Sequence, residues 1–257
     1  WGQNNDGQLG VGNYSSGSWG YSPNQVLMPS GVNATAISLG SYHTCVVVED
    51  GRAFCWGFNV DGSVGDGTAG TDRNVPTQVS GTTSYVSISS GNNHNCAITT
   101  TATVQCWGDN FKQQIGLGFY TPSDQTTPQD TALPVGAEVS SLALGDAHAC
   151  AVLRTMIVYC WGDDANYQLG TSYICQGGDS TNGCAPTAYG NRHTPALAQL
   201  PTGRGGIAAA TGSSSTCIFL DNGGLYCFGS NSDGQLGNGT YIGYGPTYAD
   251  FPSGVSP

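Results

Sequence analysis

Short apolar runs alternate with turns rich in glycine and asparagine along the whole chain. In one such stretch the apolar run Cys45–Val48 is followed by the turn Glu49–Gly51 and then by a second apolar run that ends at Trp56. Two apolar runs on either side of a short turn that contains glycine indicate a β-hairpin. The 40 glycines among 257 residues disfavour helices. The pattern therefore predicts an all-β fold.

This hairpin belongs to a unit that recurs along the sequence. An aromatic residue, a glycine and a loop of the form Asn/Asp-x-x-Gly-Gln-Leu-Gly occur together five times, with small variations. A second shared line, with two cysteines, precedes four of the five. Four-stranded units repeated every 40–55 residues or so are typical of β-propeller blades, which stack to bury their faces. The aromatic residues, expected to pack the blades, are Trp1, Trp56, Trp107, Trp161 and Phe228.

Each unit predicts four short strands in a fixed order. We order them as a proline-led strand such as the one at Pro76, a strand that ends in glycine, a first cysteine strand and the aromatic-Gly strand. In this order the chain begins with a lone aromatic-Gly strand at Trp1, contains about four complete blades, and ends with a lone proline-led strand at Pro246. The sequence thus predicts one repeat domain over residues 1–257, a fragment of a longer chain with partial terminal blades. Flanking sequence or a neighbouring subunit would supply the rest of a larger propeller.

Three motifs carry a resemblance to a known family: Gly-x-x-His before the hairpin at His43, His94 and His148, the aromatic-Gly pair, and Gly-Gln-Leu-Gly. On these motifs the chain resembles the regulator of chromosome condensation family, in a secreted variant that carries disulfides. The resemblance covers nearly all of the chain and implies a β-propeller, which in this family is commonly seven-bladed. The chain departs from the pattern where Ser215 replaces the histidine, Phe228 replaces tryptophan, and Gln113 and Tyr167 replace a loop glycine.

Cysteine spacing predicts disulfides. Four pairs have nine residues between their members, which places the two cysteines opposite each other across a hairpin, about 4.5 Å apart at Cα and within disulfide reach. A zinc site would favour the short Cys-x-x-Cys spacing, which is absent. A fifth pair would close an inserted loop. The predicted pairs are Cys45/Cys55, Cys96/Cys106, Cys150/Cys160, Cys217/Cys227 and, in the inserted loop, Cys175/Cys184.

Disulfides form in oxidising compartments, so we expect a secreted, extracellular or cell-surface protein. Three Asn-x-Ser/Thr sequons, at Asn13, Asn33 and Asn238, agree with that compartment and predict N-glycans there.

The net charge of −11, with a single lysine, argues against a nucleic-acid partner, because binding to phosphates needs clustered Lys and Arg. The sequence contains no run of 18 apolar residues, so we predict no membrane insertion. An acidic surface would instead attract cations or a basic partner.

The residues that look chemical have structural interpretations. His43, His94 and His148 occupy the same place in different blades and so do not converge; we interpret each as a structural histidine that hydrogen-bonds within its own blade. Asn and Asp before glycine, as at Asp6 and Asp61, fit tight turns, while calcium binding at such turns stays open. We predict no catalytic residue, metal site or cofactor.

We expect a non-catalytic protein-interaction or structural module that binds another protein or assembles with itself, as in a glycosylated surface appendage or filament. Loops on a rigid scaffold are the usual place for recognition. Named members of the family include a nucleotide-exchange factor for a nuclear GTPase and a secreted inhibitor of β-lactamases. A secreted inhibitor of an extracellular enzyme is therefore the alternative. A glycan-binding propeller is the second alternative, and an enzyme ranks last.

Overall fold

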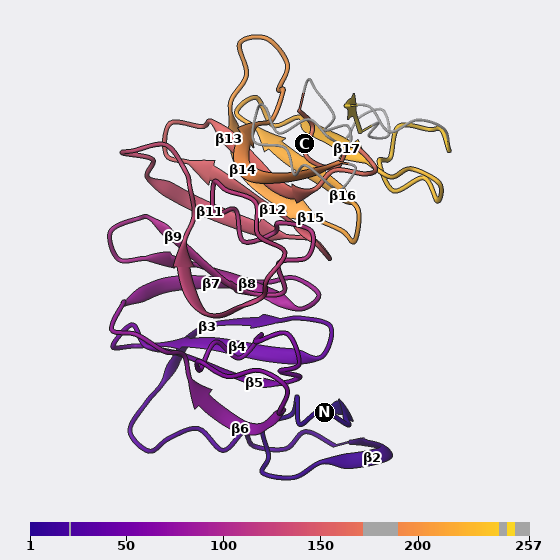
Figure 1. Ribbon diagram of the computed structural model, residues 1–257. Helices are drawn as coiled ribbons and strands as arrows, with labels where there is room; N and C mark the ends of the chain where they lie inside the picture. Colours follow the sequence, from indigo (N-terminus) through magenta and orange to yellow (C-terminus); the bar gives the residue numbers. More distant parts are fainter. Residues whose placement is uncertain (21, 172–189, 242–245, 250–257) are drawn as a thin grey trace. The chain divides into compact units, whose positions relative to one another are not determined.

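Four-stranded antiparallel sheets make up most of the structure, a computed structural model that describes residues 1–20, 22–171, 190–241 and 246–249 (Figure 1). The regular elements in these ranges are β-strands, which confirms the all-β prediction. None of the described residues forms a helix long and apolar enough to cross a membrane.

The chain divides into two compact units. Unit 1 comprises residues 1–111 and 123–130, and unit 2 comprises residues 112–122 and 131–257. Each unit contains two of the four-stranded sheets, which have the strand arrangement of propeller blades.

The first sheet of unit 1 contains β3 (Ala34–Leu39), β4 (His43–Val48), β5 (Ala53–Gly57) and β6 (Arg73–Gln78), paired in that order. β4 and β5 are buried along their whole length, whereas β6 forms an outer edge (Figure 1). The central hairpin therefore lies in the core, as its apolar sequence predicts.

The second sheet repeats this arrangement with β7 (Tyr85–Ser90), β8 (His94–Thr99), β9 (Val104–Gly108) and β10 (Gln125–Asp130). β7 packs against β3 and β4 of the first sheet, so the two sheets share one core.

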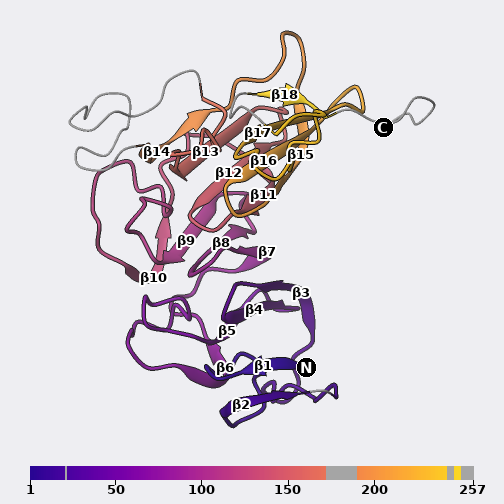
Figure 2. The same cartoon turned by 90° about the vertical axis from the view of Figure 1, so that its right-hand side faces the viewer.

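A two-stranded sheet of β1 (Gly2–Asn4) and β2 (Ser15–Gly20) completes unit 1. Figure 2 shows β1 near β6, and the N–H of Gly12, in the loop after β1, donates to the carbonyl of Asn74 at 2.9 Å.

Unit 2 contains the third and fourth sheets. The third sheet is formed by β11 (Val139–Leu144), β12 (His148–Leu153), β13 (Val158–Asp163) and β14 (Asn191–Leu197). The fourth is formed by β15 (Gly206–Thr211), β16 (Ser215–Leu220), β17 (Leu225–Gly229) and β18 (Thr247–Tyr248).

The prediction from sequence began each sheet with the wrong strand. The proline-led strand pairs with the aromatic-Gly strand that precedes it: Thr77 of β6 lies opposite Cys55. After β5 the chain returns beside its own hairpin as β6, and the first strand of the next sheet, β7, begins only after β6. The proline-led run at Pro246 is consequently not a lone strand, because Thr247 and Tyr248 pair with β17 and complete the fourth sheet. Likewise, β1 is paired with β2.

The hairpin turns need one residue with positive φ. Gly51 fills this position between β4 and β5 with φ of 84°, and a Cβ there would lie 2.7 Å from Cβ of Ser84. In the second sheet the same turn has Ala102 with φ of 63°. Gln113 and Tyr167, which replace loop glycines, also keep positive φ, at 65° and 63°. The local backbone geometry is thus retained where glycine is lost.

Candidate interaction surface

A disulfide crosses the central hairpin of each four-stranded sheet, and seven of the eight cysteines involved are buried. Cys45 lies directly opposite Cys55, with the Cα atoms 4.1 Å apart, and both residues are fully buried. The other three pairs have the same register and Cα separations of 4.0–4.1 Å. These pairs, Cys96–Cys106, Cys150–Cys160 and Cys217–Cys227, are bonded as the spacing predicts. Cys175 and Cys184 lie outside the described residues.

A carbonyl group in the loop after an aromatic-Gly strand accepts a hydrogen bond from the next sheet. The indole Nε1–H of Trp56 donates to the carbonyl of Gln8 at 2.9 Å, and that of Trp107 donates to the carbonyl of Ser63 at 3.1 Å. In unit 2 the indole of Trp161 reaches the carbonyl of Gln114 at 2.8 Å. The buried aromatic side chains therefore join consecutive repeats, and we call each such contact a junction.

At three junctions an amide or hydroxyl side chain donates to this carbonyl, at two of them as a second donor and at one as the sole donor. Asn95 Nδ2 donates to the Ser63 carbonyl at 2.8 Å. Thr44 Oγ1 donates to that of Gln8 at 3.0 Å. In the fourth sheet Phe228 has no indole, and Thr216 Oγ1 alone donates to the carbonyl of Gln168, at 2.8 Å. The residue directly before the first cysteine of the hairpin is therefore a donor to the loop carbonyl, a role that the sequence pattern did not reveal.

The histidines take part in the junctions as well. His43 Nε2 lies 2.9 Å from Asn95 Oδ1, and His148 Nε2 lies 2.9 Å from Thr216 Oγ1. Both partners belong to the following sheet, so the prediction of a hydrogen bond within the same blade is wrong for His43 and His148. The ring of His43 lies where a Cβ on Gly40 would be, which explains the Gly-x-x-His motif.

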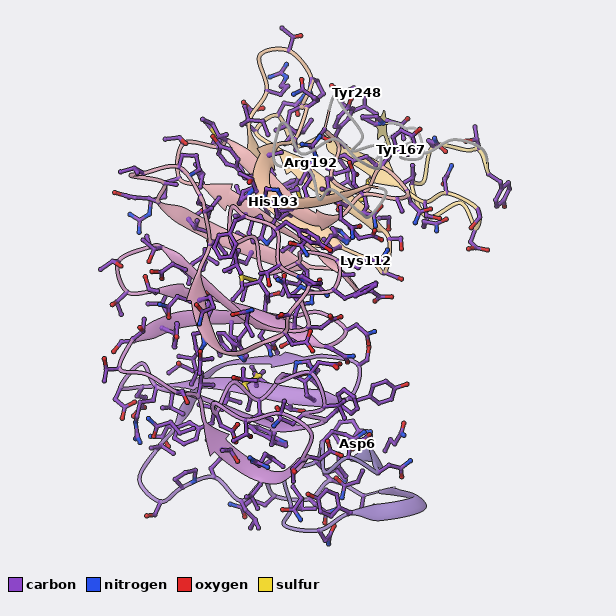
Figure 3. The ribbon with its side chains drawn as sticks, viewed as in Figure 1. Asp6, Lys112, Tyr167, Arg192, His193 and Tyr248 are labelled. Atoms are coloured by element: carbon purple, nitrogen blue, oxygen red, sulfur yellow. A yellow bond between two sulfur atoms is a disulfide. The ribbon has the colours of Figure 1, made fainter. Side chains whose placement is uncertain are left out.

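Burial makes these histidines poor bases. It lowers the pKa of His43 and of His148 to about 4, and His94 is equally buried. His43 and His148 therefore stay neutral at physiological pH, as a structural role requires. His193, on β14 beside Arg192 (Figure 3), contacts the hydroxyl of Thr194 through Nδ1 at 3.0 Å.

One loop replaces the usual asparagine with Asp164. In the other loops this position has Asn4, Asn59, Asn110 or Asn231, and Asn59 shows the pattern: Oδ1 accepts from Val64 N–H, while Nδ2 donates to the carbonyls of Thr68 and Thr71. Asp164 Oδ1 likewise accepts from the N–H of Leu169 at 2.9 Å. Its carboxyl group is buried, and burial raises its pKa to about 7. The positive charge of Arg192, which is also buried, acts in the opposite direction and lowers this pKa.

An open apolar groove of about 390 Å³ lies beside Trp1 in unit 1, lined also by Ile37, Leu39 and Trp56. Trp1 is 76% exposed, whereas the equivalent aromatic residues of the sheets are buried. Ile37 is 63% exposed, but Ile88 at the same position of β7 is only 8% exposed, because β3 and β4 pack over β7.

Loops at one end of the unit 1 sheets gather aromatic and acidic side chains, and we call this surface the loop face. It is formed by the turns that join β3 to β4 and β7 to β8, and by the unit 1 residues that follow β1, β5 and β9. The rings of Tyr42 and Phe58 lie 6.3 Å apart, and the N–H of Phe58 donates to the Tyr42 carbonyl. The apolar members are Tyr42, Phe58, Val60 and Phe111, and the acidic ones are Asp6, Asp61, Asp66, Asp72, Asp109 and Asp124.

Three acidic residues of the loop face, Asp61, Asp109 and Asp124, lie near one another beside the turn between β7 and β8. Asn93 Nδ2 donates to Asp61 Oδ2 at 2.9 Å, and the Asn93 carbonyl accepts from the N–H of Asp109. The N–H of Asn110 donates to Asp124 Oδ1 at 3.1 Å. Burial, and then repulsion from Asp109 and Asp124, raises the pKa of Asp61. In the described part of the chain, no group of three or more His, Cys, Asp or Glu side chains is arranged to hold a metal ion.

The loop face was not predicted from the sequence. Tyr42, Phe58 and Phe111 occupy positions that vary between repeats, and this variability within a constant frame is the signal that could have found them. The predicted sequons lie at the surface: Asn13 and Asn33 are exposed, and Asn238 is half-buried.

Comparison with known proteins decides the family. A model of the regulator of chromosome condensation (RCC1) repeat matches residues 1–47 and 50–98, and a second model of that description matches 34–63, 85–114, 139–168 and 207–235. These ranges together span more than half of the chain. The chain belongs to the RCC1-repeat family. The resemblance inferred from the sequence motifs is thereby confirmed.

Two relatives show how much of an RCC1-repeat protein the chain represents. It is 26% identical to the probable E3 ubiquitin-protein ligase HERC6 of Homo sapiens, over 96% of this chain and 22% of that protein. It is 24% identical to the ultraviolet-B receptor UVR8 of Arabidopsis thaliana, over 94% of this chain and 51% of that protein. The chain thus spans from about a fifth to about half of the length of these relatives.

Solved structures confirm the RCC1-type β-propeller fold. Human WBSCR16 has a TM-score of 0.77 at 17% identity, over 97% of this chain and 62% of that chain. Yeast RCC1 (Prp20), solved in complex with Kap60, has a TM-score of 0.72 at 20% identity, over 88% of this chain and 51% of that chain.

Proposed function

We propose that this RCC1-repeat chain is a non-catalytic, extracellular protein-interaction or structural module. The observation that carries the proposal is the disulfide that crosses the hairpin of each four-stranded sheet. A scaffold fixed in this way holds variable loops rigidly, and rigidly held loops are suited to recognition. Paired cysteines persist in oxidising compartments.

The histidines support a binding role over an enzymatic one. His43 and His148 are buried, stay neutral and belong to separate junctions, so they do not form a catalytic pair. The solved relative bound to Kap60 shows an RCC1-type propeller in complex with a protein. We infer that a protein partner or a second copy is the ligand here too.

The test is capture from the extracellular fluid of the native source. The purified full chain, immobilised at one end, should retain a specific protein, while heat-unfolded chain on the same support should not. Sedimentation velocity measures self-association in parallel. A chain that stays monomeric and retains nothing would overturn the proposal. Retention of an enzyme whose activity falls on binding would favour the inhibitor alternative.

The compartment is tested separately, on chain isolated from its natural source. We expect N-glycans at Asn13, Asn33 and Asn238, of which Asn13 and Asn33 are the exposed ones. Intact-mass analysis before and after glycosidase treatment measures occupancy. A bare chain with reduced cysteines would contradict an extracellular location.

A further inference from the structure

We infer that the loop face of unit 1 binds a basic segment of a different protein, one in which Lys or Arg side chains alternate with apolar ones. This inference rests on the proposed interaction function and names the partner chemistry. Three apolar side chains of the loop face are exposed to solvent: Phe111 by 67%, Val60 by 50% and Tyr42 by 44%. Large apolar side chains gathered on one surface mark interaction sites.

The negative charge of the loop face indicates that its partner is positively charged. Asp61 accepts from Asn93 and lies close enough to Asp109 and Asp124 for their charges, after burial, to raise the pKa of Asp61. Asp6, labelled in Figure 3, lies close enough to Asp72 for the charge of Asp72, after burial, to raise the pKa of Asp6. The one cation of this face, Arg73, is already bound to Asp66 at 2.7 Å. Carboxylates that repel each other are stabilised by incoming positive charge.

A second copy of the chain is poorly suited to supply that charge, because it has a net charge of −11 and its six Lys and Arg side chains already lie beside carboxylates. Five of the six pair with carboxylates, at 2.7–3.9 Å, and the sixth, Arg192, is 3% exposed beside Asp164. The paired cations are Arg52, Arg73, Lys112, Arg154 and Arg204. The partner is therefore a different chain that carries free basic residues.

The geometry favours an extended peptide over a lone cation. Phe111 follows Asp109 closely, and its N–H donates to Asp109 Oδ1 at 2.8 Å. Val60 directly precedes Asp61. Asp61 and Asp109 thus each have an apolar neighbour, and a peptide that alternates basic and apolar side chains meets both kinds of group.

The test measures binding of three fluorescent peptides to the full chain by anisotropy. The first alternates Arg and Leu with Gly spacers, the second has Glu for Arg, and the third has Ser for Leu. We expect tight binding of the first alone, and weaker binding as salt is raised, because exposed charges are screened. Equal binding of the first and second peptides would overturn the inference.

Isosteric amides locate the site. Asp61→Asn and Asp124→Asn keep an Oδ1 that accepts the hydrogen bonds from Asn93 and Asn110, so the fold is retained. Each should weaken binding about three- to fivefold, the size of one exposed ion pair. Glu49→Gln removes the same charge at the opposite end of the first sheet and should have no effect.

The apolar contribution has its own pair of variants. Phe111→Ser should weaken binding of the Arg/Leu peptide, while Val135→Ser, at a fully exposed valine outside the loop face, should not. Equal losses for Asp61→Asn and Glu49→Gln would show non-specific attraction and overturn the inference. If the first peptide does not bind but the chain still captures a protein from native fluid, the inference fails and the proposed function stands.

Discussion

The indole Nε1 of Trp107 donates to the carbonyl oxygen of Ser63 at 3.1 Å, and this bond holds a loop of one repeat against the sheet of the next. Trp107 is fully buried, and Gly65 in the same loop packs so closely on the indole that a Cβ there would lie 2.7 Å from it. Aromatic ring, carbonyl and glycine thus form one contact, which explains why these residue types recur together.

The Trp107→Phe variant tests the junction. It removes the donor and part of a buried ring, so we expect the free energy of unfolding to fall by about 1–3 kcal/mol. Trp1→Phe is the matched control, because Trp1 is largely exposed and the change should stay within about 0.5 kcal/mol. Urea denaturation of both variants measures the difference. Similar values for the two variants would contradict the junction's role.

The hairpin disulfides should stabilise each sheet separately. Replacing Cys96 and Cys106 together with alanine should lower the free energy of unfolding by about 2–3 kcal/mol, because the cross-link no longer restricts the unfolded chain. Binding by the loop face should be unchanged. Non-reducing peptide mapping should recover every predicted pair, including Cys175–Cys184, and a link between different sheets would contradict the assignment.

Asp164 should make stability depend on pH. Its pKa is about 7 in the folded chain against an ordinary value of 3.8, so the folded state binds the proton more tightly. Stability is then highest below about pH 4, falls as the pH rises towards 7, and levels off above it. Asp164→Asn should remove this fall and raise stability at pH 8 by about 1–3 kcal/mol.

Thermal unfolding between pH 4 and pH 8 measures the effect of Asp164→Asn. The control is Asp233→Asn, at an exposed position in the loop after β17, which should leave the pH profile as it is. A profile that Asp164→Asn does not flatten would show that the carboxyl group is not the titrating group.

Ala102→Gly should stabilise the second sheet. Ala102 has φ of 63°, a left-handed conformation that costs a residue with a Cβ about 1 kcal/mol. The opposite change in the first sheet, Gly51→Ala, should destabilise by more, because its Cβ would also press on Ser84. Chemical denaturation of the two variants should therefore give effects of opposite sign.

The sequence predicted what local spacing encodes and missed what repeats share with their neighbours. Nine residues between cysteines across a turn determine the pairing of Cys45 with Cys55. The partner of His43, in contrast, is Asn95, in the next sheet and 52 residues away, and no spacing within one repeat encodes that contact. The prediction that the proline-led strand at Pro76 opens a sheet was wrong for another reason. A periodic pattern gives the order of the strands along the chain, but not the strand with which a sheet begins.

The junctions give the repeat array a direction. A loop is closed by an indole or hydroxyl of the sheet that follows it, so opening the second sheet would release the loop that contains Ser63, while the sheet's own disulfide would keep its hairpin connected. Loss of structure should therefore pass towards the N-terminus more readily than towards the C-terminus within a unit. The coupling between neighbouring repeats in such an array therefore has a direction, because each loop depends on the sheet that follows it.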